Sequence, residues 1–362
     1  MHKSITILIK KKYPRAISVR FIPHRHCEKI FMNKVAFLWG RVLGLLFAVL
    51  MASAANAAQI NYSAIYVFGD SLSDTGNDFA ATTALHMVPA IPPSVTPHAT
   101  YWQGRFSNGP VAVEYLWRIL SRNNNAQLVP FVRNPSVDER TSVNFAFGGA
   151  GSGIQNATPT GFLVPGLVGQ VGLYTTALAG RKSRRDALFV VWSGSNDYLQ
   201  NITHDPNVVV GNIATSIRSL YATGARYFLV PNLPDLGDAP LVKAQGGAAQ
   251  FTALSKSHNA LLASRLSTLS SSLPGVKIVR LDVLALGQVL MSGGLINSEV
   301  PALAYLSPGT RAEDCLFRDP TTCVDVTQFG FIAPFLYWDV LHPTTLVHGV
   351  IGTAMYEALL SE

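Results

Sequence analysis

Cysteine is scarce in this sequence of 362 residues: Cys27 lies near the N-terminus, and Cys315 and Cys323 have only seven residues between them. Two cysteines without a nearby pair of histidines supply too few ligands for a zinc site, so we expect no bound metal. In an exported protein such a pair is typical of a local disulfide, and we expect Cys315 and Cys323 to form one. Two free thiols are the alternative.

The hydrophobic run near the N-terminus is short. Residues 42–51 are apolar, about half the length that spans a bilayer. Lys34 and Arg41 precede the run, and Ala55-Asn56-Ala57 after it fits a signal-peptide cleavage site. We therefore predict a non-structural extension over 1–31, a signal peptide over 32–57 and one domain over 58–362, exported to the periplasm or the medium. An uncleaved membrane anchor is the alternative.

Excess positive charge is confined to the N-terminus. The chain has a net charge of +7, but residues 1–57 hold ten of the 28 basic residues and one of the 21 acidic ones. The remaining 18 basic and 20 acidic residues give a net charge of −2. A basic patch that binds nucleic acid is therefore not expected in the domain, and no stable protein partner is implied.

Short apolar runs alternate with helical patterns along the domain. The strand-like runs are 64–68, 142–146, 187–192, 227–230 and 276–281, and the helical patterns are 111–120, 167–178, 208–223, 248–273 and 345–360. This alternation predicts an α/β fold, a three-layer α/β/α sandwich with a central parallel sheet. Such sheets bind ligands at the carboxyl ends of their strands.

A serine stands at the carboxyl end of the first of these strands. The run 64–68 is followed by Gly69-Asp70-Ser71, so a rigid strand would hold the Ser71 hydroxyl at the edge of the sheet. That placement suits a nucleophile. A serine that only caps the next helix is the alternative.

A serine nucleophile requires a general base and a group that orients the base. Asp339 and His342 are three residues apart, just before the last helical pattern. On a tight turn, residues i and i+3 face the same way, so the carboxylate can orient the imidazole. A buried or capping histidine is the alternative for His342.

The motifs together resemble the GDSL, or SGNH, family of serine esterases and lipases. Gly69-Asp70-Ser71-Leu72 is similar to its first block, 144–151 to its second, 194–197 to its third and 339–342 to its last, all in the family's order. The resemblance implies a flavodoxin-like SGNH hydrolase domain and a catalytic triad of Ser71, Asp339 and His342. It also implies an oxyanion hole formed by the backbone N–H groups of Ser71 and Gly149 and the amide of Asn196. Gly148 is the alternative to Gly149.

The resemblance favours a secreted branch of the family. Residues 231–237 and the pair Cys315 and Cys323 are similar to its phospholipase, lysophospholipase and acyltransferase members. The implied activity is hydrolysis of lipid esters without a cofactor. The resemblance allows the ester to be one presented at a membrane surface. Acyl transfer to a sterol or another alcohol at the same site is one alternative. A non-catalytic exported binding protein is another.

Two further stretches have no regular pattern. Residues 82–109 are rich in proline and aromatic residues, which predicts either a wall over an acyl-chain pocket or a surface loop anchored by its aromatic residues. Residues 284–305 are apolar with several glycines and are expected to form a partly exposed lid or flap.

Overall fold

The computed structural model describes residues 61–94, 101–138, 141–294, 296–305, 323–325 and 334–361. Asn61–Glu362 form one compact unit. The predicted extension and signal peptide, as well as Cys27 and Cys315, lie outside the described residues. Within the described ranges, no helix has the length and apolar character needed to cross a membrane.

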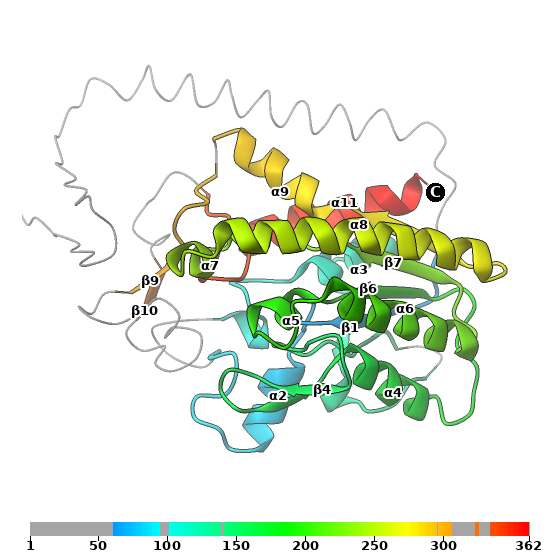
Figure 1. Cartoon of the computed structure of the whole chain (residues 1–362). Helices are drawn as coiled ribbons and strands as arrows, with labels where there is room; N and C mark the ends of the chain where they lie inside the picture. The colour runs from blue at the N-terminus through cyan, green and yellow to red at the C-terminus, as the bar shows by residue number, and fades with distance from the viewer. Residues whose placement is uncertain are drawn as a thin grey trace, which may run out of the picture. The chain divides into compact units, whose positions relative to one another are not determined.

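A six-stranded parallel sheet forms the centre of the fold (Figure 1). In spatial order its strands are β2 (Val129–Pro130), β3 (Val143–Asn144), β1 (Ile65–Gly69), β6 (Leu188–Trp192), β7 (Tyr227–Pro231) and β8 (Lys277–Leu281). After β1, the next two strands along the chain, β2 and β3, lie on one side of β1, and β6 then lies on its other side. This reversal leaves a crevice at the carboxyl ends of β1 and β6, where flavodoxin-like sheets bind their ligands.

The core on one face of the sheet is aromatic. All five residues of β1 are buried, and alternate side chains of a strand point to opposite faces. Phe68 stacks on Phe145 with 5.2 Å between the ring centroids, and Tyr174 meets the edge of Phe68 at 5.6 Å. These rings fix β1, and with it the turn that follows it.

Helices cover both faces of the sheet. The aromatic face is covered by α4 (Leu167–Ala177), α6 (Pro206–Thr223) and α8 (Ala248–Ser272), whose side chains share a core with β1 and β6. On the other face α3 (Ala112–Ser121) packs against α11 (Thr345–Leu360), which also contacts β8. The predicted α/β/α sandwich is therefore confirmed.

Shorter elements connect this framework. The helical ones are α2 (Asn77–Ala84), η1 (Trp102–Gly104), η2 (Phe131–Arg133), α5 (Ser195–Leu199), η3 (Leu236–Asp238), α7 (Pro240–Ala244) and α9 (Val283–Ser292). Two antiparallel pairs are β4 (Gln155–Ala157) with β5 (Leu163–Pro165) and β9 (Leu303–Tyr305) with β10 (Cys323–Asp325). Cys323 is buried on β10. Because Cys315 is not described, the disulfide stays a prediction.

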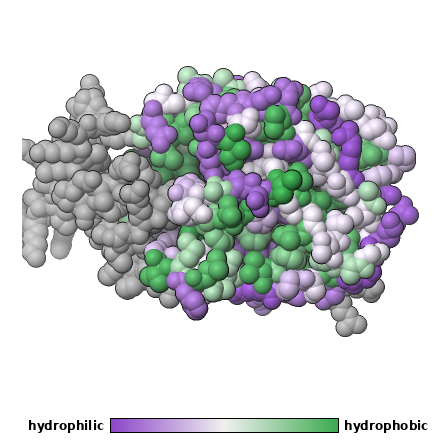
Figure 2. All heavy atoms as spheres, turned by 60° about the horizontal axis from the view of Figure 1, so that its bottom comes forward, coloured by the Kyte–Doolittle hydropathy of each residue, from purple (hydrophilic) through white to green (hydrophobic). Residues whose placement is uncertain are grey.

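Apolar side chains are also present at the surface. Figure 2 turns the bottom of Figure 1 toward the viewer, and hydrophobic residues occupy much of the middle of this face. The exposed large apolar residues include Leu85 at the end of α2 and Ile154 and Leu163 near the β4–β5 pair. Single exposed apolar residues are usual in soluble proteins, so they do not by themselves mark a site.

Candidate active site

The turn after β1 is held by a buried carboxyl group. The Asp70 carbonyl accepts the N–H groups of Ser73 and Asp74, both at 3.0 Å, and one Asp70 carboxyl oxygen accepts the Leu72 N–H at 3.0 Å. Burial raises the pKa of Asp70 to about 7, against the lowering effect of the Leu72 hydrogen bond. The turn therefore presents Ser71 from a fixed backbone.

Gly69 allows this turn to lie close to the neighbouring strand. A Cβ atom at this position would stand 2.2 Å from the carbonyl oxygen of Trp192 on β6, so no larger residue fits. The Gln170 side chain accepts the Gly69 N–H at 2.9 Å and donates to the Gly69 carbonyl at 2.8 Å. Gly69 is paired with Trp192 in the register of β1 and β6, so the carboxyl ends of these two strands lie side by side.

Three residues far apart in the sequence form one hydrogen-bonded chain. The Ser71 hydroxyl lies 2.8 Å from Nε2 of His342, and Nδ1 of His342 lies 2.7 Å from a carboxylate oxygen of Asp339. All three side chains are buried. The imidazole can therefore accept the serine proton while Asp339 fixes the tautomer with hydrogen on Nδ1.

Asp339 receives four hydrogen bonds. One oxygen accepts the backbone N–H groups of Leu341 and His342 at 2.8 and 2.7 Å, and the other accepts the Tyr101 hydroxyl at 2.7 Å and the His342 ring. Burial acts to raise the pKa of Asp339, but the charge of His342 and these hydrogen bonds outweigh it and leave the pKa below its ordinary value. Asp339 is therefore held as a carboxylate.

The described part of the aromatic loop contacts the Asp–His pair. Tyr101 binds Asp339, and the Phe106 ring lies 5.2 Å from the His342 ring, centroid to centroid. Neither residue is among those that line the cleft described below, so the predicted wall over an acyl pocket is wrong for these two aromatic residues. They position the triad instead.

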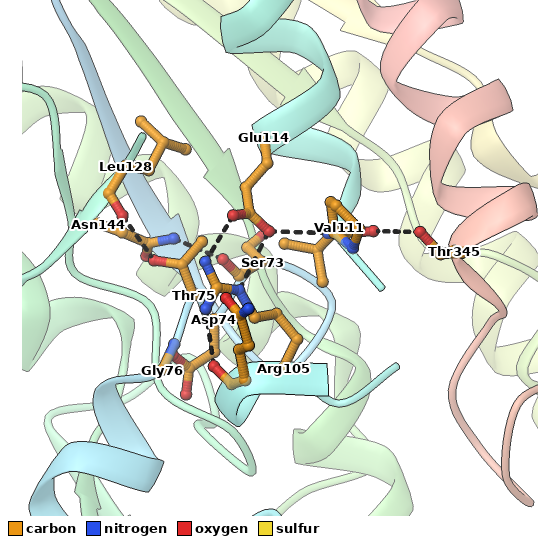
Figure 3. Close-up of polar contacts among 12 residues, drawn as sticks. Ser73, Asp74, Thr75, Gly76, Arg105, Val111, Glu114, Leu128, Asn144 and Thr345 are labelled. Carbon is orange, nitrogen blue, oxygen red and sulfur yellow. Dashed lines mark hydrogen bonds and ion pairs between the residues drawn. The ribbon is translucent and has the colours of Figure 1, made fainter. Parts of the chain in front are cut away.

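An ion pair fixes the segment that carries these two rings. Arg105 pairs with Glu114 of α3 at 2.6 Å, and Glu114 also accepts the backbone N–H of Val111 at 3.0 Å (Figure 3). The Arg105 guanidinium stacks over the Trp102 ring at 4.8 Å. Because the pair is largely buried, it holds the segment more firmly than an exposed pair would.

The same segment also caps the helix that follows His342. Asn108 accepts the backbone N–H of Thr345, the first residue of α11, at 2.8 Å. The Ser107 hydroxyl donates to the Pro343 carbonyl at 2.9 Å. These two bonds attach the His342 turn to residues more than 200 positions away, which sequence patterns alone did not indicate.

Asparagine and threonine side chains attach the loop after β1, which carries Ser71, to the rest of the sheet. Asn144 of β3 donates to the Ser73 carbonyl at 2.6 Å, and the Thr75 hydroxyl donates to the Leu128 carbonyl at 3.2 Å (Figure 3). The loop is thereby anchored on the side opposite β6.

The predicted oxyanion donors lie around the same loop. The Asn196 amide lines the cleft with Ser71 and donates to the Ala150 carbonyl at 3.1 Å, which leaves its second hydrogen for another acceptor. The Gly148 N–H donates to Asp74 at 3.2 Å, whereas the Gly149 N–H has no acceptor among the described residues. Gly149 has a φ of 73°, a conformation that favours glycine. This geometry favours Gly149 over Gly148, although neither glycine lines the cleft.

Asp197, next to Asn196, has a structural role. Its carboxylate accepts both the backbone N–H and the hydroxyl of Ser152, at 2.8 and 2.7 Å. Burial raises the pKa of Asp197, while the two Ser152 bonds oppose the rise. Asp197 thus joins the turn after β6 to the glycine-rich residues 148–153, which include Ser152.

The triad opens onto a mostly apolar cleft. Ser71, Asn196 and His342 line it, and its cavity volume is about 110 Å³. Apolar side chains of α9 and α11 form much of the rest of the lining. Among the described residues, no group of three or more His, Cys, Asp or Glu side chains could hold a metal ion.

Comparison with known proteins identifies the family. Residues 65–355 match the family model described as GDSL-like Lipase/Acylhydrolase. The chain belongs to this family. Membership agrees with the resemblance in the four sequence blocks, and it makes the protein a carboxylic ester hydrolase.

Individual relatives of this GDSL protein are distant. GDSL esterase/lipase At5g63170 of Arabidopsis thaliana is 28% identical over 336 residues, 85% of this chain and 93% of the relative. The phosphatidylcholine-sterol acyltransferase of Aeromonas hydrophila is 31% identical over 227 residues, 61% of this chain and 58% of the relative. A crystal structure of a lipolytic G-D-S-L family member from Veillonella parvula is 11% identical, with 82% of this chain and 96% of the other covered, at a TM-score of 0.40.

Proposed function

We propose that this GDSL protein hydrolyses lipid esters through an acyl-enzyme on Ser71. One observation carries the proposal: Ser71, His342 and Asp339 form a continuous hydrogen-bonded chain beside an apolar cleft. Serine, imidazole and carboxylate in this order are the groups that acyl transfer requires.

In the first half of the reaction, Nε2 of His342 accepts the proton of Ser71 while Oγ bonds to the ester carbonyl carbon. Nδ1–H of His342 donates to Asp339 throughout, so the positive charge that develops on the ring faces a carboxylate. The carbonyl oxygen becomes an oxyanion. It accepts hydrogen bonds from the N–H groups of Ser71 and Gly149 and from the free hydrogen of the Asn196 amide.

The intermediate then collapses. The bond from the carbonyl carbon to the alcohol oxygen breaks, and His342 gives its proton to the leaving alcohol. In the second half, His342 takes a proton from water, which attacks the acyl carbon. The bond to Ser71 breaks, the serine regains its proton, and the carboxylic acid leaves.

Three observations support a lipid ester as substrate. The cleft beside Ser71 is mostly apolar, several relatives carry the name esterase/lipase, and residues 32–57 have the pattern of a signal peptide. Phospholipase A, lysophospholipase and lipase activities all fit these features. Export to the periplasm or medium is part of the proposal. Mass spectrometry of the exported protein tests it, because cleavage of the signal peptide should leave a chain that begins just after Ala57.

The decisive test is the Ser71→Ala variant of the purified protein. Hydrolysis of p-nitrophenyl octanoate and labelling by a fluorophosphonate should both disappear, because the acyl-enzyme cannot form. Ser216→Ala is the matched control, since the Ser216 hydroxyl is also buried and has no partner among the described residues. Wild-type turnover by Ser71→Ala would refute the mechanism. A wild-type protein that neither turns over esters nor takes the label would indicate a non-catalytic binding protein.

Acyl transfer to an alcohol is the second candidate function. It is favoured by the similarity to the phosphatidylcholine-sterol acyltransferase, and it differs only in the acceptor of the acyl group. An assay with phospholipid and cholesterol in one vesicle separates the two reactions. Free fatty acid as the product supports hydrolysis, whereas cholesteryl ester as the main product supports transfer.

A further inference from the structure

Helix α9 presents one face to the catalytic cleft and the other to solvent. Leu284, Gly287 and Met291 line the cleft and follow the i, i+3, i+7 spacing of a single helix face. Val289, on the other side, is 68% exposed. In Figure 1, α9 lies above α8 and beside α11. Residues of α11 line the same cleft.

Val283, Leu286 and Leu290 of α9 also line the cleft, so Gly287 is the one cleft-lining position of α9 without a side chain. Gly287 lies between Leu284 and Met291, and apart from its chain neighbours and the backbone of α9 itself, no described atom lies within 4 Å of the point where its Cβ would be. Close packing against a neighbour therefore does not require glycine here. Helix stability does not require it either, because glycine is among the poorest helix formers. Gly287 does leave open space in the cleft.

The polar side of the cleft lies elsewhere. Asp238 of η3 and Asp235, the residue before η3, are among the lining residues. Helix α9 contributes apolar residues and Gly287. An ester with its carbonyl at Ser71 would therefore place its alkyl chain toward α9 and its polar portion toward η3.

We propose that α9 is the wall of the acyl-chain site and that Gly287 determines how long an acyl chain the enzyme accepts. This inference rests on the proposed function, since it takes Ser71 as the acylated residue. The ligand is an unbranched alkyl chain of a fatty acyl ester. A side chain at position 287 would fill the path of the distal methylene groups and leave the carbonyl end free.

The test is a graded series, Gly287→Ala, Gly287→Leu and Gly287→Phe. All three residues form helices better than glycine, so the series is expected to fold. Gly211→Leu is the matched control, because Gly211 also lies within a helix, α6, with open space at its Cβ, but does not line the cleft. The assay measures kcat/KM for p-nitrophenyl acetate, butyrate, octanoate and palmitate.

Larger side chains should shorten the preferred acyl chain step by step. With about 0.8 kcal/mol per buried methylene, each methylene that loses its place in the cleft lowers kcat/KM about fourfold. Gly287→Leu should therefore lower kcat/KM for octanoate and palmitate at least about tenfold, while acetate stays within about twofold. Gly211→Leu should change none of the four.

Other outcomes separate the two proposals. If the wild type hydrolyses these esters but Gly287→Leu lowers all four equally, or leaves their ratio unchanged, the acyl-site inference is wrong and the proposed function stands. A change of the same size in Gly211→Leu also overturns the inference. If the wild type hydrolyses none of the esters, or Ser71→Ala retains full activity, the proposed function itself fails.

Discussion

Replacement of Tyr101 by phenylalanine tests whether this tyrosine positions the triad. The Tyr101 hydroxyl donates to Asp339 at 2.7 Å, and both side chains are 1% exposed, so water cannot take the place of the lost donor. A hydrogen bond to a charged group contributes about 1.5–3 kcal/mol. Tyr101→Phe should lower the free energy of unfolding by that amount at pH 7.

The effect should depend on pH. Because the pKa of Asp339 is lowered in the folded protein, its ionised form contributes stability fully above the ordinary value of about 3.9. That contribution is lost as the pH falls through the folded pKa. Once Asp339 is protonated, Tyr101 makes only a neutral hydrogen bond, worth about 0.5–1.5 kcal/mol. The difference between wild type and variant should therefore shrink in acid.

Urea unfolding at a series of pH values, from pH 7 down to the lowest pH at which the protein stays folded, measures this difference. Tyr174→Phe is the matched control, since Tyr174 is also fully buried but its hydroxyl bonds to the neutral Ser183 hydroxyl at 2.8 Å. Its effect should be the same throughout this range. The variant Tyr101→Phe should also lower kcat with little change in KM, because Asp339 is less firmly held. A loss of stability in Tyr101→Phe that stays constant over the whole range would refute the role of Tyr101 as a donor to a carboxylate.

Two further predictions concern residues around the turn after β6. Asn196→Ala should lower kcat about 10²–10³-fold, as loss of an oxyanion donor does in other hydrolases; steady-state kinetics that show less than about a threefold loss would contradict that role. Burial lowers the pKa of His258 to about 4 in the folded protein. The stability that the neutral ring contributes is therefore complete above about pH 6.5. The free energy of unfolding falls by about 3 kcal/mol as the pH decreases toward 4, because the unfolded chain binds the proton more readily. His258→Gln lacks this slope, and the wild-type-minus-variant difference in urea unfolding should decline by that amount between pH 7 and pH 4; a constant difference would show that His258 protonates freely.

The strands of the central sheet could be predicted well because they are buried on both faces. Such strands appear as continuous apolar runs, and the runs at 64–68, 187–192 and 227–230 correspond to β1, β6 and β7. Strand β2 was not predicted, since it has two residues and one of them is Pro130, which is unusual inside a strand. Helix α5 was not predicted, since its five residues are too few to show a helical period.

The candidate site was predictable only where a local motif marks it. Ser71, Asp339 and His342 stand in recognisable blocks, and the structure brings the three together. Tyr101 could not be predicted, because 238 positions separate it from Asp339 and nothing near it in the sequence marks a partner.

The order of these groups along the chain has a consequence for biosynthesis. Ser71 lies in the turn directly after the first strand, β1, whereas its base comes 271 positions later, in the turn before α11. At about 5–20 residues per second, the ribosome adds His342 roughly 15–55 s after Ser71. A nascent chain therefore carries an unactivated Ser71 hydroxyl until His342 has been added, and ester cleavage cannot begin before that point.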